Sequence, residues 1–315
     1  MQISMARERY VHWLSAVRDL SPHTVRAYSG DLVAFEHHLG PATSIEEIDR
    51  QHLLAFIERQ REAGLSVTSI RRRACALRGF CRWLKATELL TDDSGLDFSI
   101  AAARSRQLPR FVPPSELRRL LAHLRREVGL VDVSDEGATL RNPHDATTLL
   151  AVALMLTTGV RVQEVVGIRA ADVDLWSRSL RLLGKGRRER EVYLTNRWLT
   201  ELTRSYLAVR ERLGISHDRL LFNRHLSPLT PPAMRGRLAK ATEAAGLRCR
   251  VTPHMLRHSA ATQLIEAGVD IRYIQRLLGH ASLSTTEIYT HVSDAALRRV
   301  VSEADILRRL DTSDN

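Results

Sequence analysis

The sequence lacks a long hydrophobic segment. No stretch of its 315 residues approaches the ~18 to 20 uninterrupted apolar residues that a membrane-spanning helix needs, and the N-terminus, MQISMARERYVHWL, has no apolar signal-peptide core. Cysteine is scarce as well. Cys75, Cys81 and Cys249 are an odd number without metal-ligand spacing, which supports neither a disulfide framework nor a zinc site. We therefore expect a soluble, cytoplasmic protein.

Lysine is almost absent. The 47 basic residues include only three lysines, Lys85, Lys185 and Lys240, so 44 are arginine. Against 36 acidic residues they give a formal net charge of +11 and a pI near 10.3. A charge of this sign fits a protein that neutralises nucleic-acid phosphates, although a merely basic soluble enzyme would also carry it. Because arginine replaces lysine almost everywhere, a lysine at a special position becomes informative.

Helical signals dominate the first ninety residues. Ser21 and Pro22 form an N-cap and a first-turn proline before an amphipathic segment that stops at Gly40 and Pro41. Further helices are expected over about 49–64 and 66–84. The segment 91–112 then loses helical periodicity and is rich in Asp, Ser, Gly and Pro, which is typical of an interdomain linker.

The second part of the chain mixes helices with one β-hairpin. An apolar helix, LLAVALMLTT, ends at Gly159, and the short strands SLRLLG and REREVYLT follow, joined by a turn around Lys185. The polar stretch at 126–145 resembles a loop or insertion. From Trp198 onward the signals are helical again. The fold class we expect is mainly α with a small β-sheet in the second domain (α+β).

Familiar cofactor and metal motifs are missing. The sequence GKGRRER lacks the spacing of a phosphate loop and sits in a hairpin, so ATP is not implied. His254 and His258 are four residues apart but have no adjacent glutamate, which leaves metal hydrolysis unsupported. We expect neither a cofactor nor a metal.

One predicted helix carries a strip of cations. Between residues 71 and 85 the chain has six basic residues and no acid. At the helical step Arg71, Arg78, Arg82 and Lys85 fall within a ~60° arc beside an apolar stripe. Such a strip is either a solvated face or a contact surface for DNA phosphates. We take these four residues as candidate DNA-binding residues.

Several polar residues stand at helix ends, where chemistry can be positioned. Thr252 and Pro253 begin a helix on which His254 and Arg257 lie three residues apart, on a terminus that favours an anion. Arg161 follows the end of the apolar helix. Ser284 and Glu287 form a capping box before Tyr289. Each of these alone would more often be structural.

Together, the motifs resemble the tyrosine recombinase (integrase) family, and within it the Xer branch. The similar strings are TTGVRVQEVVGI, LLGKGRRER, TPHMLRHSAATQLIEAGVDIRYIQRLLGH and LLGHASLSTTEIYTHV, and LSPHTVRAYSGDLVAFEHHL resembles the family's core-binding domain. The resemblance extends over nearly the whole chain. It implies an N-terminal core-binding domain over 1–100, a linker over 101–112 and a catalytic domain over 113–315, which together form a C-shaped clamp around DNA.

The resemblance also assigns candidate catalytic residues. Arg161 and Arg257 match the clamp that neutralises charge on the scissile phosphate, and Tyr289 matches the nucleophile that forms a 3′-phosphotyrosyl bond. Lys185 matches the proton donor to the leaving oxygen, a role that arginine cannot readily fill. His254 resembles an acid/base or phosphate-orienting histidine, and His280 the second phosphate-contacting position. This set needs no ATP.

Neighbouring polar residues are expected to have structural roles. For Glu164, Thr252, His258 and His291 we expect a place on a helix surface, a capping or packing role, or a role in supporting the site residues from behind. Tyr193 and Tyr206 are expected to be ordinary strand and helix residues. After Tyr289, apolar residues recur at helical steps over about 294–310. This helix either folds back on its own domain or docks on a neighbouring protomer, as the resemblance implies, in a DNA-bound tetramer.

The function that the resemblance implies is site-specific recombination through a Holliday junction, with duplex DNA as the partner. Xer-like resolution of chromosome or plasmid dimers is the favoured role. It leaves open a paralogous recombinase or a DNA translocase as an additional partner. Integration or transposition of a mobile element remains an alternative, because the stretch at 126–145 departs from the compact Xer pattern. A type IB topoisomerase and a non-catalytic DNA-binding protein are the remaining alternatives.

Overall fold

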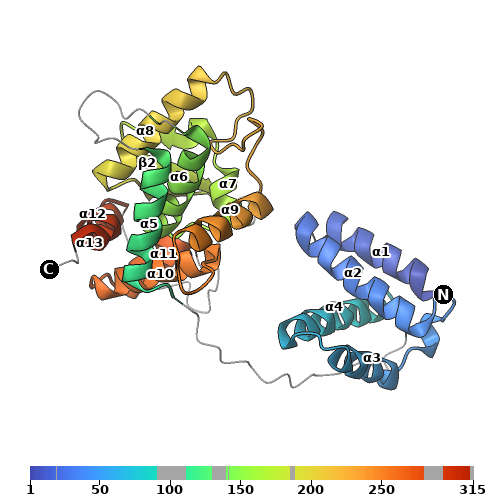
Figure 1. Cartoon of the computed structure of the whole chain (residues 1–315). Helices are drawn as coiled ribbons and strands as arrows, with labels where there is room; N and C mark the ends of the chain where they lie inside the picture. The colour runs from blue at the N-terminus through green and yellow to red at the C-terminus, as the bar shows by residue number, and fades with distance from the viewer. Residues whose placement is uncertain are drawn as a thin grey trace. The chain divides into compact units, whose positions relative to one another are not determined.

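The computed structural model describes residues 1–18, 20–90, 111–129, 140, 142–184, 189–279 and 294–312. The chain forms two compact units, Met1–Arg106 and Gln107–Asn315. The described residues are mostly helical with one three-stranded sheet, which confirms the predicted fold class (Figure 1). No helix among them is both long and apolar enough to cross a bilayer.

Within residues 1–18 and 20–90, the N-terminal unit has four α-helices and one short 3-10 helix. Their bounds are α1 (Ile3–Ala16), α2 (Pro22–Leu39), η1 (Ile45–Glu47), α3 (Arg50–Glu62) and α4 (Val67–Ala86). The predicted cap of α2 is present, since the Ser21 hydroxyl accepts a hydrogen bond from the Thr24 N–H at 3.2 Å. The sequence indicated helices here without resolving α1. This helix contributes Tyr10, whose ring stacks on Trp13 and lies 5.4 Å from the rings of Phe80 and Trp83 on α4.

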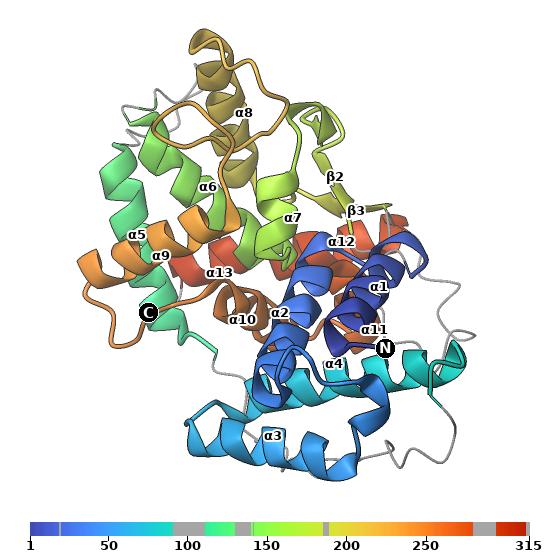
Figure 2. The same cartoon turned by 90° about the vertical axis from the view of Figure 1, so that its right-hand side faces the viewer.

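The second unit is built around α6 (Pro143–Thr158), in which every residue from Ala146 to Thr158 is buried. The helices that contact it include α5 (Pro114–Val128), α8 (Arg197–Arg212), α9 (Pro231–Ala244) and α10 (Pro253–Glu266) (Figure 2). A helix that is apolar on all sides is stable only when neighbours cover every face. The continuous apolar run seen in the sequence therefore marks the centre of this unit.

The sheet lies beside the short helix α7 (Val162–Gly167), which contacts β2. After the 3-10 helix η2 (Ala170–Asp172), the strands β1 (Val173–Asp174), β2 (Ser179–Leu183) and β3 (Glu189–Tyr193) pair antiparallel in that order. Leu180 faces Val192 and Leu182 faces Arg190 across the β2–β3 pair. The antiparallel strand pair of the predicted hairpin is therefore present, whereas its turn around Lys185 lies outside the described residues. The two-residue strand β1 was not predicted.

The C-terminal helices pack on their own unit. After α11 (Ile271–Leu278), the chain ends in α12 (Asp294–Ala304) and α13 (Ile306–Thr312). The stripe predicted to need a covering surface is buried here, with Leu297, Ala304, Leu307 and Leu310 at most 4% exposed. Helix α13 contacts α5, α6 and α10, and Arg125 on α5 donates two hydrogen bonds to Asp311 at 2.9 and 3.2 Å. The sequence left open whether this segment folds back on its own domain or docks on a neighbouring protomer. In the structure it folds back on its own domain.

The connection between α5 and α6 is shorter than the loop that the polar stretch 126–145 predicted. Residues up to Val128 belong to α5, and Pro143 already begins α6. The interpretation of 130–139 as a loop lies outside the described residues, as do residues 91–110 of the linker signals predicted over 91–112.

Candidate active site

Arg161 lies at the start of α7, directly after the end of α6. Gly159 ends α6 in the left-handed region at φ 63°, where a glycine has no steric penalty. The chain then turns, and Arg161 becomes the N-cap residue of α7, with its backbone N–H donating to Glu164 Oε2 at 2.8 Å. Its Nη1 donates to Glu164 Oε1 at 3.0 Å and its Nη2 to the Gly279 carbonyl at 3.3 Å. With 41% of the side chain exposed, Arg161 can meet a ligand from solvent.

Arg257 lies one turn into α10. Thr252 caps this helix by accepting a hydrogen bond from the Met255 N–H at 3.3 Å, as the sequence predicted. Arg257 is only 9% exposed, and it donates from Nη1 to the Gly159 carbonyl and from Nη2 to the Leu278 carbonyl at 2.7 Å. Burial lowers the pKa of Arg257 to about 10, and the nearby charge of Arg161 contributes in the same direction. Since this pKa remains well above 7, Arg257 is a cation at neutral pH.

Both arginines therefore converge on the C-terminal end of α11. The three successive carbonyls of Leu277, Leu278 and Gly279 each accept a hydrogen bond from a different arginine, namely Arg190, Arg257 and Arg161. The C-terminus of a helix carries partial negative charge, and cations there are stabilising. These bonds hold the last described residues before position 280 against α6, α7 and α10.

Glu164 is the carboxylate shared by this cluster. Its side chain is 7% exposed and accepts hydrogen bonds from Arg161 and, at 2.9 and 2.8 Å, from Nη1 and Nη2 of Arg190. Burial acts to raise the pKa of Glu164, but the hydrogen bonds from Arg190 and from the Arg161 backbone prevail and hold the pKa below its usual value. Glu164 is therefore an anion at neutral pH.

The cluster of three arginines and one glutamate has a net charge of +2. Within the described residues, Arg161 and Arg257 each use two of their five N–H donors on protein atoms. The remaining donors and the uncompensated charge suit an oxyanion. The arrangement can bind a phosphate and can stabilise additional negative charge that develops on it.

His254 is exposed on the first turn of α10, three residues before Arg257. Residues at this spacing lie on the same face of a helix. The structure therefore brings three of the six predicted catalytic residues, Arg161, His254 and Arg257, to neighbouring helix ends. The other three, Lys185, His280 and Tyr289, lie outside the described residues, as does His291. His258, one turn after His254, is partly buried.

The tyrosines of the described residues are mostly inaccessible. Tyr10, Tyr193 and Tyr206 are 2%, 6% and 0% exposed, and burial raises the pKa of Tyr206. Tyr206 donates to or accepts from Thr147 at 2.6 Å inside the core. The sequence predicted strand and helix roles for Tyr193 and Tyr206, and none of these three hydroxyls can reach a macromolecular substrate.

The predicted cationic strip lies on α4. Arg82 is exposed, while Arg71, Arg78 and Lys85 are partly buried, and Arg78 contacts the Cys75 sulfur at 3.2 Å. Two further arginines of the same segment have a structural role. Arg72 and Arg73 pair with Asp31 of α2, which is 2% exposed, so the cations of this helix divide between a pair bound to Asp31 and the strip.

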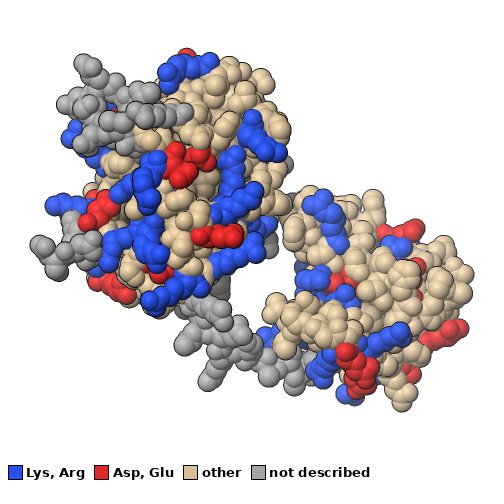
Figure 3. Space-filling model, viewed as in Figure 1, with Lys and Arg blue, Asp and Glu red and all other residues tan. Residues whose placement is uncertain are grey.

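Basic side chains are also abundant on the second unit. On the face seen in Figure 3, Lys and Arg cover more of its surface than Asp and Glu do. This distribution agrees with the net charge of the sequence.

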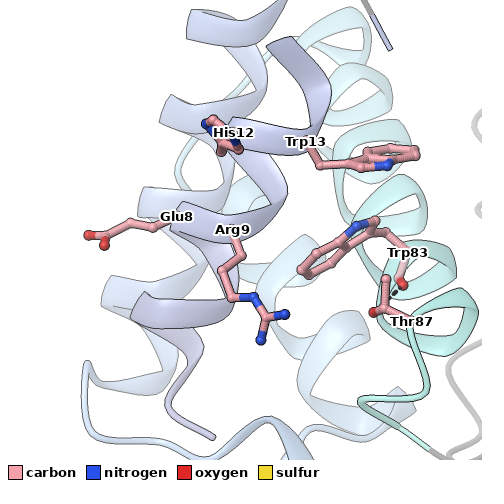
Figure 4. A pocket seen from close by; sticks show the side chains of 6 residues that line it. All are labelled: Glu8, Arg9, His12, Trp13, Trp83 and Thr87. Carbon is pink, nitrogen blue, oxygen red and sulfur yellow. Dashed lines mark hydrogen bonds between the residues drawn. The ribbon is translucent and has the colours of Figure 1, made fainter. Parts of the chain in front are cut away.

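An open hollow of about 470 Å³ lies between α1 and α4 of the N-terminal unit (Figure 4). Its lining combines two indoles with polar groups, namely Glu8, Arg9, His12, Trp13, Trp83 and Thr87. In Figure 4 the Trp13 ring lies above the Trp83 ring, and Glu8 points away from both. None of the predicted site residues lines this hollow. Among the described residues, no group of three side chains has the composition and proximity to hold a metal ion.

Two residues of the cluster had only weak signals in the sequence. Glu164 was expected to have a capping or packing role, and it does accept the Arg161 N–H. Its position three residues after Arg161 is the spacing of a capping box, and this was the available signal. Arg190 had no distinguishing signal, because it is one of four arginines between residues 181 and 190.

Comparison with known proteins gives consistent matches over nearly the whole chain. The Phage integrase family matches residues 110–296, and the Phage integrase, N-terminal SAM-like domain matches residues 8–88. Tyrosine recombinase XerD of Halalkalibacterium halodurans is 33% identical over 299 residues, which are 93% of this chain and 95% of that protein. Tyrosine recombinase XerC of Mycobacterium sp. (strain KMS) is 34% identical over 307 residues, 94% of this chain and 97% of that protein.

Solved structures agree with these relatives. The XerH site-specific recombinase bound to a palindromic difH substrate has a TM-score of 0.67 and 26% identity, over 90% of this chain and 81% of that one. A lambda integrase tetramer bound to a Holliday junction has a TM-score of 0.67 at 18% identity, over 90% of this chain and 76% of that one, and supports the fold alone. In these structures the proteins are bound to DNA, the second as a tetramer.

Proposed function

The chain belongs to the Phage integrase family and is a site-specific tyrosine recombinase, an enzyme that cuts and rejoins DNA, and we propose that Arg161 and Arg257 hold the scissile phosphate. The observation that carries this assignment is the convergence of both side chains on the end of α11. Attack on a phosphodiester places a second negative charge on the phosphoryl oxygens. A cluster of net charge +2 matches that state better than it matches the singly charged substrate, which is the condition for catalysis.

Tyr289 is the proposed nucleophile. Its hydroxyl oxygen attacks phosphorus and loses its proton, while the bond from phosphorus to the 5′-oxygen breaks. The products are a 3′-phosphotyrosyl bond and a 5′-hydroxyl on the other DNA end. Because the phosphodiester energy is kept in the new bond, the reverse attack by a 5′-hydroxyl rejoins DNA without ATP.

Proton transfer is assigned to two further residues. The departing 5′-oxygen needs a proton, which we assign to Lys185, because an ammonium gives up a proton more readily than a guanidinium does. His254, exposed beside Arg257 on α10, is assigned to the acid/base or phosphate-orienting role. His280 follows Gly279, whose carbonyl is held by Arg161, and is assigned a phosphate contact.

DNA binding and assembly extend the proposal. The strip of Arg71, Arg78, Arg82 and Lys85 is assigned to phosphate contacts of the N-terminal unit, and the two units together to a clamp around duplex DNA. Four protomers would act on two sites through a Holliday junction. Docking of the C-terminal helices on a neighbour would first require them to leave the core in which they are buried.

The proposed role is Xer-like resolution of chromosome or plasmid dimers in the cytoplasm. Identities of 33–34% to Xer recombinases over nearly the full length of both chains support it. Accumulation of plasmid dimers in cells that lack the gene would agree with this role. Normal plasmid monomers together with loss of an integration event would instead favour the mobile-element alternative.

A suicide substrate tests the chemistry. Purified protein is mixed with nicked duplex DNA that carries its recombination site, without metal or ATP, and the products are separated on a denaturing gel. We expect a covalent protein–DNA band that is absent with Tyr289→Phe and strongly reduced with Arg257→Gln. Specific DNA binding without a covalent band would contradict the proposal.

A further inference from the structure

The Arg190 side chain on β3 makes three hydrogen bonds in the candidate active site, one more than the side chain of Arg161 or of Arg257, although the sequence did not single it out. This side chain is 16% exposed. Both terminal nitrogens donate to the two oxygens of Glu164, at 2.9 and 2.8 Å, and Nε donates to the Leu277 carbonyl at 3.3 Å. This parallel, two-bond pairing of guanidinium and carboxylate fixes the geometry of the ion pair as well as strengthening it.

These three bonds join three elements that are distant in the sequence. Arg190 belongs to the hairpin, Glu164 to α7, and Leu277 to the last turn of α11. Glu164 in turn accepts from the backbone and the side chain of Arg161, and Arg161 donates to Gly279. The Arg161 guanidinium is therefore held between a carboxylate and a carbonyl that Arg190 itself helps to place.

Close packing leaves little freedom at this junction. A Cβ atom at Gly279 would lie 3.3 Å from the central carbon of the Arg190 guanidinium. Gly279 also has a φ of 63°, which ends α11 in the left-handed region. The guanidinium thus fills the space against the glycine, and the end of α11 cannot shift toward β3 without moving Arg190.

The charge balance shows what the loss of Arg190 would do. Glu164 is almost fully buried and has two arginine partners. Without Arg190, the carboxylate would keep only Arg161 as a charged partner, and the two opposite charges would pair more tightly, because a buried carboxylate is costly unless it is paired. Arg161 would then be drawn away from the position in which its remaining donors face a phosphate.

We infer that Arg190 is a positioning residue for DNA cleavage: by occupying both oxygens of Glu164 and the Leu277 carbonyl, it sets the position of Arg161 relative to the end of α11. Arg190 itself touches no reacting atom. The inference rests on the proposed function, since it assumes that Arg161 binds the scissile phosphate.

The test compares DNA binding with cleavage in Arg190→Gln and Arg190→Lys. Single-turnover cleavage of the suicide substrate at saturating DNA is expected to fall about tenfold to a hundredfold in Arg190→Gln, since small misplacements of catalytic groups cost this much. The Kd for the same DNA should change by less than about threefold, because phosphate contacts are spread over many cations. Arg190→Lys, which keeps the charge but loses the two-bond geometry, should fall between wild type and Arg190→Gln.

A second comparison separates positioning from general damage. Because Arg190 acts through Glu164, the double variant Glu164→Gln/Arg190→Gln should cleave no more slowly than the slower of the two single variants, whereas independent effects would multiply. Arg204→Gln is the matched control, since this exposed arginine on α8 has a carboxylate partner, Glu201, at 3.6 Å. It should cleave and bind as wild type does.

The outcomes are distinct. Two results would overturn this inference and leave the proposed function intact, provided that the wild-type protein cleaves the substrate. One is a cleavage rate in Arg190→Gln equal to that of wild type, and the other is a double variant in which the losses of the two single variants multiply. A parallel loss of DNA binding and cleavage in both Arg190→Gln and Arg190→Lys would show a general structural role and would also overturn it. Absence of any covalent complex with the wild-type protein would overturn the proposed function and this inference with it.

Discussion

Glu164 receives four hydrogen bonds from two arginines, and its state depends on a balance of opposing effects. Burial favours the protonated, neutral carboxyl, whereas the donors from Arg190 and Arg161 favour the anion. The donors prevail, since the net effect is a lowered pKa. The carboxylate therefore contributes to stability only while it is ionised.

This balance predicts a dependence of stability on pH. The pKa of Glu164 in the folded state lies below the 4.5 of an unperturbed glutamate, so the unfolded chain takes up this proton first as the pH falls. The stabilisation is complete above pH 4.5 and is lost as the pH falls through the folded-state pKa. Glu164→Gln should therefore show a shallower loss of the free energy of unfolding with acid than wild type does.

Urea unfolding at a series of pH values between about 6 and 3 would measure this difference. Glu201→Gln, which removes a carboxylate with one arginine contact at 3.6 Å, is the control and should follow the wild-type curve. If the curves of wild type and Glu164→Gln run parallel, Glu164 does not carry the ionised carboxylate described here.

At the residue scale, the sequence predicted the groups that a local motif marks. Arg161 and Arg257 stand in such motifs, and the structure brings both to the same helix end. The Glu164–Arg190 pair spans 26 positions between a helix and a strand. No periodic or capping pattern in the sequence links Glu164 to Arg190. Such a pair follows only from how the hairpin packs beside α7.

Among the elements, α4 shows how one helix can serve two surfaces. Its periodicity predicted an apolar stripe beside a cationic strip, and Ala74, Leu77, Cys81 and Leu84 are indeed buried. The periodicity could not show that Arg72 pairs with Asp31, because these residues are 41 positions apart. Two of the six basic residues between positions 71 and 85 therefore pair with a buried carboxylate, which the sequence alone did not indicate.

The division of α4 gives a prediction about DNA binding. Replacing Arg78 and Arg82 together by Gln should weaken binding by a similar factor for different DNA sequences, because phosphate contacts carry no base information. The slope of log K against log salt should become smaller by about 2, one unit for each lost contact. Arg61→Gln, a charge removal at the exposed end of α3, is the control.

Fluorescence anisotropy at several salt concentrations would measure both quantities. An unchanged salt slope in the Arg78→Gln/Arg82→Gln variant, together with wild-type affinity, would show that the strip is a solvated face and would remove it from the proposed DNA contacts.

At the scale of the whole molecule, the C-terminal helices complete the core of the second unit. Leu307 is fully buried and Leu310 is 1% exposed on α13, the helix that contacts α5, α6 and α10. The sequence predicted that this stripe needed a partner surface, but an amphipathic pattern is the same for a partner within the chain and for one on a neighbour. In the structure the partner surface lies within the chain and is formed by α5, α6 and α10.

This arrangement predicts that a core substitution in the tail destabilises the isolated protein. Leu307→Ala should lower the free energy of unfolding by about 2 to 5 kcal/mol, the usual cost of such a cavity. The effect should be the same at low and high protein concentration and without DNA. The exposed Glu303→Ala on α12 is the control. If Leu307→Ala destabilised the protein only at concentrations where protomers associate, the C-terminal helices would instead dock on a neighbouring protomer.

The central claim is that this enzyme cleaves DNA through Tyr289, and mapping the covalent adduct tests it most directly. The complex trapped on the suicide substrate is digested with nuclease and trypsin, and the peptide that carries the nucleotide is identified by mass spectrometry. Cleavage after Arg276 and Arg298 releases residues 277–298, in which Tyr289 is the only tyrosine. The account predicts the nucleotide on this peptide, at Tyr289. A nucleotide on any other peptide, such as the one containing Tyr273, would contradict it.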